Sequence, residues 1–221
     1  MTATATSYVR FMNGYYSRSD YFRADVEKGT IRTPTGTRIC TLTDDFLRGF
    51  RSAVQFECGK ATDRVFKSCG KRWGTSFVER FDRELTEHFG VPLQDMSAGI
   101  VERCLDEAFR YHGWGTVSID LRDYDSGFVT IETRDSAMPA IVGTSDKPSD
   151  ALFTGFFAAI VSHYAKLELD SIQTECPSRG NETSKFVVGL ADRLKDVPAW
   201  VKDRIPHATI LRRLTTATPN N

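Results

Sequence analysis

Apolar positions along the 221-residue chain follow two different periods. Some stretches have apolar residues every three or four positions, which predicts helices with one buried face. These helical stretches are 44–58, a long one from about 60 to 88, 93–112 and 150–166. Shorter stretches of alternating or continuous apolar residues predict strands at 21–26, 30–33, 38–42, 116–121, 128–132, 169–176 and 184–188.

The order of these elements indicates the fold class. Three strands are followed by three helices, two strands, one helix and a final hairpin. The segments 124–127 and 177–181 carry turn residues, so the strands that they join form antiparallel pairs. We therefore expect a mixed α/β (α+β) fold rather than a βαβ alternation. We predict one domain over 20–205, a flexible N-terminal extension over 1–19 and a C-terminal tail over 206–221, since both ends are polar without a period.

Two glycines interrupt the longest predicted helix. Gly70 and Gly74 each cost about 1 kcal/mol of helix propensity relative to alanine. They mark either kinks or places where another element packs closely against the helix.

Composition and charge exclude several classes of protein. Lys plus Arg and Asp plus Glu both number 29, so a formal net charge of zero gives no attraction to nucleic acid and little repulsion between copies. The most apolar run, 151–161, is far shorter than the ~20 residues of a membrane span. The first residues lack the pattern of a secretory signal, and the five cysteines form no C-x-x-C pair. We expect reduced thiols and a cytoplasmic protein.

Catalytic and cofactor motifs are missing from the sequence. It contains no phosphate-binding glycine loop, no G-x-S-x-G and no H-E-x-x-H, and its four histidines are far apart. We expect no catalytic residue and no cofactor.

Candidate ligand-binding residues occur in two places. His112 and Trp114 flank a helix-to-strand junction and offer polar groups to an apolar cavity. An aromatic stripe on the predicted helix 150–166 is either core or the wall of such a cavity. Its candidate members are Phe153, Phe156, Phe157 and Tyr164. Cys176, at a strand end beside a turn, is either a buried small apolar residue or a reactive thiol.

Several motifs follow one another in a fixed order. They are Tyr21-Phe22-Arg23, Gly29-Thr30-Ile31, Gly36-Thr37-Arg38, the glycine-interrupted helix, Asp150-x4-Gly155-Phe156, and Cys176-x3-Gly180-x5-Phe186-x-Val188. This set, over about residues 21–190, resembles the 4-vinyl-reductase-like domain family, whose fold is similar to that of TRAPP subunits. The resemblance implies a twisted antiparallel sheet packed against helices, a homodimer, and a pocket for a hydrophobic small molecule.

The resemblance also implies a test for zinc. Sensor members of this family, from bacterial regulators that respond to aromatic compounds, hold a structural zinc with three cysteines and a glutamate. The matching positions here are Asp150, Gln173, Cys176 and Ser184. Only Cys176 matches, and these residues cannot complete a tetrahedral zinc site, so we expect no bound metal.

We expect from these observations a stand-alone sensor or carrier domain for a hydrophobic or aromatic ligand. The phenylalanines of the stripe would form the walls, and His112 and Trp114 would orient a polar group. One alternative is an enzyme or accessory protein of (bacterio)chlorophyll-type metabolism, related to tetrapyrrole vinyl reductases. The other is a dimeric interaction module with a vestigial pocket.

Overall fold

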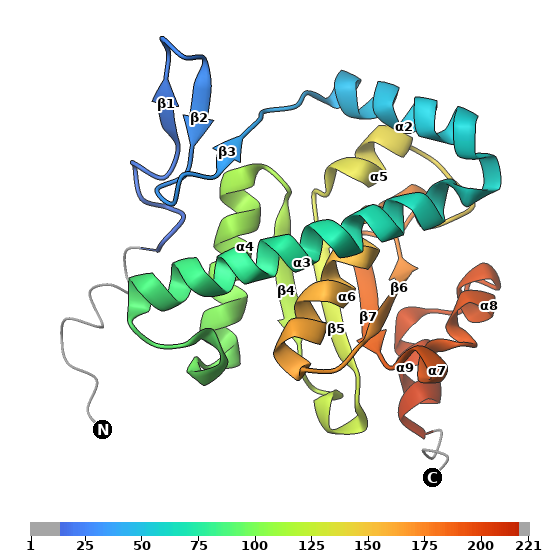
Figure 1. Cartoon of the computed structure of the whole chain (residues 1–221). Helices are drawn as coiled ribbons and strands as arrows, with labels where there is room; N and C mark the ends of the chain where they lie inside the picture. Colours follow the sequence, from blue (N-terminus) through green and yellow to red (C-terminus); the bar gives the residue numbers. More distant parts are fainter. Residues whose placement is uncertain (1–13, 217–221) are drawn as a thin grey trace.

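Two antiparallel sheets organise the chain (Figure 1). The structure, a computed structural model, describes residues 14–216. The smaller sheet has the order β1-β2-β3, with β1 Arg23–Asp25, β2 Thr30–Arg32 and β3 Arg38–Ile39. The larger sheet has the order β4-β5-β7-β6, with β4 Thr116–Asp120, β5 Val129–Arg134, β6 Asp170–Glu175 and β7 Ser184–Gly189.

Helices fill most of the remaining chain. They are α2 (Asp44–Cys58), α3 (Thr62–Phe89), α4 (Ala98–His112), α5 (Ala137–Val142), α6 (Ala151–Ala165), α7 (Ala191–Leu194), α8 (Val197–Lys202) and α9 (His207–Thr216). Within residues 14–216, no helix is both long and apolar enough to cross a bilayer.

Helices α3 and α6 touch along their backbones, and glycine makes this contact possible. A Cβ atom at Gly70 would lie 1.8 Å from the carbonyl oxygen of Leu152, and one at Gly155 would lie 1.9 Å from that of Lys67. Any other residue would therefore push the two helices apart. Gly70 and Gly74 thus mark close packing, the second of the two interpretations offered by the sequence.

The larger sheet is covered on both faces. Successive side chains of a strand point to opposite faces, and β7 shows this clearly. Phe186 and Val188 belong to the main core with α3, α4 and α6, whereas Val187 packs in a second cluster with residues of α7, α8 and α9. Figure 1 shows α6 between α3 and the sheet, with α7 to α9 (red) beside β6 and β7. The expected mixed fold with an antiparallel sheet packed against helices is confirmed.

The predicted chain ends need correction. Residues 207–216, expected in a tail, form α9. The helix forms because its apolar side chains Ile210 and Leu214 pack in the second cluster, with residues of α7, α8 and β7. In the predicted extension, Tyr15 and Tyr16 are buried in the main core. The rest of that extension, 1–13, and the last residues, 217–221, lie outside the described residues.

Candidate ligand-binding cavities

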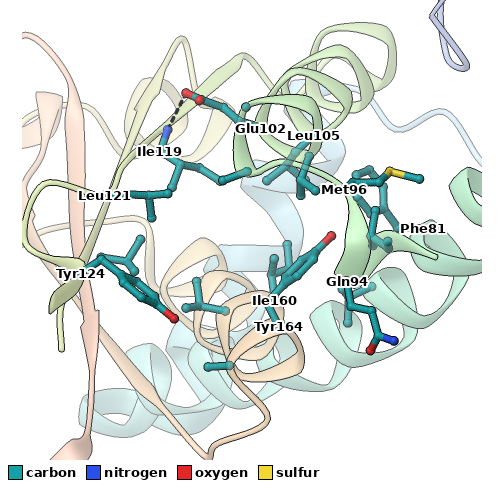
Figure 2. A pocket seen from close by; sticks show the side chains of 18 of the residues that line it. Phe81, Gln94, Met96, Glu102, Leu105, Ile119, Leu121, Tyr124, Ile160 and Tyr164 are labelled. Carbon is teal, nitrogen blue, oxygen red and sulfur yellow. Dashed lines mark hydrogen bonds between the residues drawn. The ribbon is translucent and has the colours of Figure 1, made fainter. Parts of the chain in front are cut away.

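A first cavity of about 580 Å³ lies where α3, α4, α6 and the larger sheet meet; we call it the α4 cavity (Figure 2). Its volume is in the range of small-molecule sites. Its walls are mainly apolar and aromatic. The lining residues are Phe77, Val78, Phe81, Leu93, Gln94, Met96, Ala98, Gly99, Val101, Glu102, Leu105, Ile119, Leu121, Tyr124, Asp125, Val129, Ile160, Val161, Tyr164 and Ala165.

Tyr164 supplies a buried polar group to this cavity. Its hydroxyl is shielded from solvent and has no hydrogen-bond partner among residues 14–216. Burial raises the pKa of Tyr164, so the phenol stays protonated at neutral pH. In Figure 2 the hydroxyl points from α6 toward Leu105 and Phe81 on the opposite walls. A buried hydroxyl without a partner is costly, and a ligand that bonds to it recovers that cost.

Glu102 on α4 joins the cavity wall to the edge strand β4. Its Oε1 accepts a hydrogen bond from the backbone N–H of Ile119 at 2.8 Å (Figure 2). One turn further along α4, Oδ1 of Asp106 accepts from the N–H of Val117 at 3.0 Å. These two carboxylates satisfy N–H groups of an edge strand that would otherwise stay unpaired. Of the two, only Glu102 also lines the α4 cavity.

A second cavity, of about 630 Å³, lies against the N-terminal part of the chain; we call it the hairpin cavity. Residues 22–47 supply one side, and α3, the 111–114 segment, the 136–138 segment and the start of α6 supply the other. The lining residues are Phe22, Ile31, Thr37, Arg38, Ile39, Cys40, Thr41, Leu42, Asp44, Leu47, Trp73, Arg80, Tyr111, His112, Gly113, Trp114, Ser136, Ala137, Met138, Leu152 and Phe153.

His112 has a defined protonation pattern at this cavity. Its Nδ1 lies 2.8 Å from the carbonyl oxygen of Ala108, which can only accept, so Nδ1 carries the proton. Burial is the main cause that lowers the pKa of His112, and Arg80 lowers it further. The imidazole is therefore neutral at pH 7, and its Nε2 is an acceptor. Nε2 is buried and has no hydrogen-bond partner in the described part of the chain.

The charges of the hairpin cavity are mainly positive. Arg38 and Arg80 line it together with one carboxylate, Asp44. Among the described residues, Arg80 forms one ion pair, a long one of 3.9 Å from its Nε to Oε1 of Glu84, and its guanidinium lies 5.5 Å from the centre of the Phe77 ring. The Glu84 carboxylate accepts a shorter hydrogen bond from Thr35 at 2.6 Å.

The structure divides the residues predicted from the sequence between three places. His112, Trp114 and Phe153 line the hairpin cavity, and the rings of His112 and Trp114 lie 4.6 Å apart. Tyr164 lines the α4 cavity. Phe156 and Phe157 are fully buried and line neither of these two cavities.

Both cavities also contain residues that the sequence analysis did not single out. In the α4 cavity these include Glu102 and Tyr124, and in the hairpin cavity Arg38 and Arg80. Phe77 and Phe81 lie on the buried face of α3, and period analysis cannot tell a core contact from a cavity wall.

The four positions that match the zinc ligands of the resembling sensors do converge, but their side chains are engaged in hydrogen bonds with neighbouring groups. The Gln173 amide accepts from the backbone N–H of Asp150 at 2.9 Å and donates to the Ser184 hydroxyl at 3.0 Å. The Asp150 carboxylate accepts from Ser136. Among the described residues, no three His, Cys, Asp or Glu side chains are placed to hold a metal ion. An amide and a hydroxyl do not fit a structural zinc site.

This polar cluster is buried throughout. Burial raises the pKa of Asp150 to about 6, although the Ser136 hydrogen bond opposes the shift. Cys176 is fully buried, and its sulfur lies 3.3 Å from the Ser149 hydroxyl. The thiol is therefore part of the packed interior, which agrees with the interpretation of Cys176 as a small buried residue.

Comparisons with solved structures show similarity at the level of the fold. The chain is similar to the phenol-responsive sensory domain of the transcription activator PoxR, solved with phenol, at a TM-score of 0.65 and 14% identity, over 92% of this chain and 100% of that one. At this identity the similarity concerns the fold.

Two further structures are less similar. A vinyl-4-reductase family protein from Methanocaldococcus jannaschii has a TM-score of 0.45 at 14% identity, over 68% of this chain and 82% of that one. A trafficking protein particle complex subunit 3 from Naegleria fowleri, covalently bound to palmitic acid, has a TM-score of 0.49 at 13% identity, over 66% of this chain and 94% of that one. No protein-family model and no curated protein matches the sequence.

Proposed function

We propose that this protein is a sensor or carrier domain that binds a small, mostly apolar molecule, of the size of a substituted aromatic ring, in the α4 cavity. The observation that carries the proposal is the unpartnered, buried hydroxyl of Tyr164 in an apolar cavity of about 580 Å³. The fold similarity to a phenol-responsive sensory domain supports it. Membership of the 4-vinyl-reductase-like family is part of the same proposal.

The polar group of the ligand is a hydroxyl or carbonyl that bonds to Tyr164. Among residues 14–216, no Lys, Arg or His lines the α4 cavity, whereas two carboxylates, Glu102 and Asp125, do. Burying an anion there would leave its charge unpaired. The ligand in this cavity is therefore uncharged.

Calorimetric titration with phenol, 4-methylphenol and toluene tests the proposal. Both phenols should bind, and Tyr164→Phe should weaken their binding about tenfold because one buried hydrogen bond is lost. Binding of toluene should be unchanged. Tyr124→Phe is the matched control, since Tyr124 lines the same cavity but is 62% exposed. If none of the three compounds binds or raises the melting temperature, the proposal is wrong.

A homodimer and a cytoplasmic location belong to the proposal as well. No residue of helix α2 is fully buried, and Phe46 and Phe50 are 52% and 51% accessible. Such an aromatic face suits a second copy, and the zero net charge opposes association little. Analytical ultracentrifugation of the Phe46→Ser, Phe50→Ser variant should show a monomer. The five free cysteines suit a reducing compartment.

The same face of α2 is the observation that favours the alternative of a dimeric interaction module. In that case the dimer would persist while neither cavity bound a ligand. No observation in the structure specifically favours a vinyl reductase.

A further inference from the structure

We propose that the hairpin cavity is a second, independent binding site, and that it takes an aromatic carboxylate carrying a hydroxyl group, such as a hydroxybenzoate. The proposal does not depend on the α4 cavity. It rests on three features of the hairpin cavity that lie together: an unused acceptor, guanidinium groups and aromatic walls.

The acceptor is Nε2 of His112. Because Nδ1 donates to the Ala108 carbonyl, Nε2 carries the lone pair and can only be satisfied by a donor. Within residues 14–216, it has none. A ligand hydroxyl donates a hydrogen bond, whereas a carboxylate cannot. His112 therefore selects a ligand with an O–H group.

The guanidinium groups are those of Arg80 and Arg38. Arg80 is 20% exposed, and its carboxylate neighbour Glu84 is 3.9 Å away, beyond hydrogen-bond length. Arg38 is exposed and forms no ion pair within the described chain. A guanidinium binds a carboxylate through two parallel N–H groups. Asp44 is the one acidic residue of the lining, so the cavity keeps a positive excess.

Aromatic rings line the space between these groups. Trp73 and Trp114 meet edge to face with ring centroids 4.9 Å apart, and Phe153 lies 6.0 Å from Trp73. These rings provide the edges and faces against which another ring packs. A volume of about 630 Å³ holds a single substituted ring with room to spare.

Titration of the full chain with 4-hydroxybenzoate, benzoate and phenol, followed by calorimetry and by tryptophan fluorescence, tests the proposal. 4-Hydroxybenzoate should bind about tenfold more tightly than benzoate, which lacks the hydroxyl. It should change the fluorescence, because Trp73 and Trp114 line this cavity and no tryptophan lines the other. His112→Phe should remove its advantage over benzoate, and Arg80→Gln should weaken both carboxylates at least tenfold.

Arg83→Gln is the matched control, since Arg83 is exposed on the same helix and lines neither cavity. Arg38→Gln repeats the charge test should Arg80→Gln unfold the protein. The proposal is overturned if no carboxylate binds, if benzoate binds as tightly as 4-hydroxybenzoate, or if Tyr164→Phe rather than the arginine variants weakens binding. If phenol binding responds only to Tyr164→Phe, that supports the proposal that phenol binds in the α4 cavity. It leaves the test of carboxylate binding in the hairpin cavity unaffected.

Discussion

The α4 cavity and the hairpin cavity have similar volumes, about 580 and 630 Å³, and share helix α3 as a wall. Their charges are opposite. Within the described part of the chain, the α4 cavity is bordered by Glu102 and Asp125 and by no cation, whereas Arg38 and Arg80 line the hairpin cavity against one carboxylate. The volume of the cavities therefore does not distinguish the two sites. The few polar groups do, because a buried charge or hydroxyl is costly unless its partner is present.

The cavities also differ in construction. The α4 cavity is bordered by elements that pack in the main core, among them α4, α6 and β5. The hairpin cavity has one side built from residues 22–47, which include the three short strands β1 to β3. We therefore expect changes in the N-terminal part of the chain to affect anion binding and to leave the α4 cavity intact.

The close contact between α3 and α6, two helices that border both cavities, should be the position most sensitive to substitution. Gly155→Ala places a methyl group 1.9 Å from the Lys67 carbonyl, which forces α3 and α6 apart. Overpacking of this kind should lower the free energy of unfolding by about 3 kcal/mol. Urea denaturation measures this loss, and ligand binding at both cavities should weaken with it.

Gly49→Ala is the matched control for this prediction. Gly49 lies in α2, where a Cβ atom would meet nothing within 4 Å. Alanine should raise stability there by up to about 1 kcal/mol through helix propensity. Equal effects of the two substitutions would show that the α3–α6 contact is not as close as described.

Filling the α4 cavity should separate the two sites. Val161 is half-buried on α6 and lines only this cavity. Val161→Trp should weaken phenol binding about a hundredfold by occupying the ligand's volume, while the affinity for 4-hydroxybenzoate stays unchanged.

Val65→Trp is the control for the added ring, because Val65 is 40% exposed on α3 and lines neither cavity. Calorimetry on the two variants is sufficient. A loss of both ligands in Val161→Trp, with the fold retained, would mean that there is one site rather than two.

Much of the fold could be predicted from the sequence, because the local pattern of apolar and turn residues indicates most helices and strands. The residue pattern predicted strands at the positions of β1 and β2, and close packing at Gly70 and Gly74 was one of the two interpretations that the sequence offered. The short α5 and the end of the chain were missed. Helix α9 forms because its apolar face covers the far side of the sheet, and that is a tertiary effect.

The candidate site could be predicted only in part. The sequence offered chemical types: a polar pair at 112 and 114, and an aromatic stripe on the helix that became α6. It could not say that Phe153 and Tyr164, eleven positions apart on one helix, line different cavities. Arg80 and Glu102 gave no signal, because charged residues on helices are common and only the assembled fold shows which of them border a cavity.

The pH dependence of the hairpin cavity should reveal the role of His112. Burial lowers its pKa from the ordinary 6.5, so the ring is neutral above that pH and Nε2 accepts the ligand hydroxyl. As the pH falls through the lowered pKa, Nε2 gains a proton and can no longer accept. The affinity ratio of 4-hydroxybenzoate to benzoate should be about ten at pH 7.5 and should fall toward one as the pH is lowered below about 6.5.

This ratio isolates the hydroxyl, because both ligands carry the carboxylate and respond equally to the added positive charge. In His112→Phe the ratio should stay near one at every pH. A ratio in the wild-type protein that does not change with pH would assign the hydroxyl to another acceptor.

The smallest effect should come from the charge at the α4 cavity. Glu102→Gln keeps a carbonyl oxygen that can accept from the Ile119 N–H, so β4 stays attached to α4. The substitution removes one of two carboxylates that repel anions. For a partly exposed charge this repulsion amounts to less than about 1 kcal/mol, so weak binding of benzoate in this cavity should strengthen about threefold. Measured in an Arg80→Gln background, which weakens the competing site in the hairpin cavity, calorimetry can resolve that change. Asp106→Asn, which alters the neighbouring carboxylate outside the α4 cavity, should leave benzoate binding unchanged, and an equal gain there would mean that net charge rather than the cavity wall sets the preference.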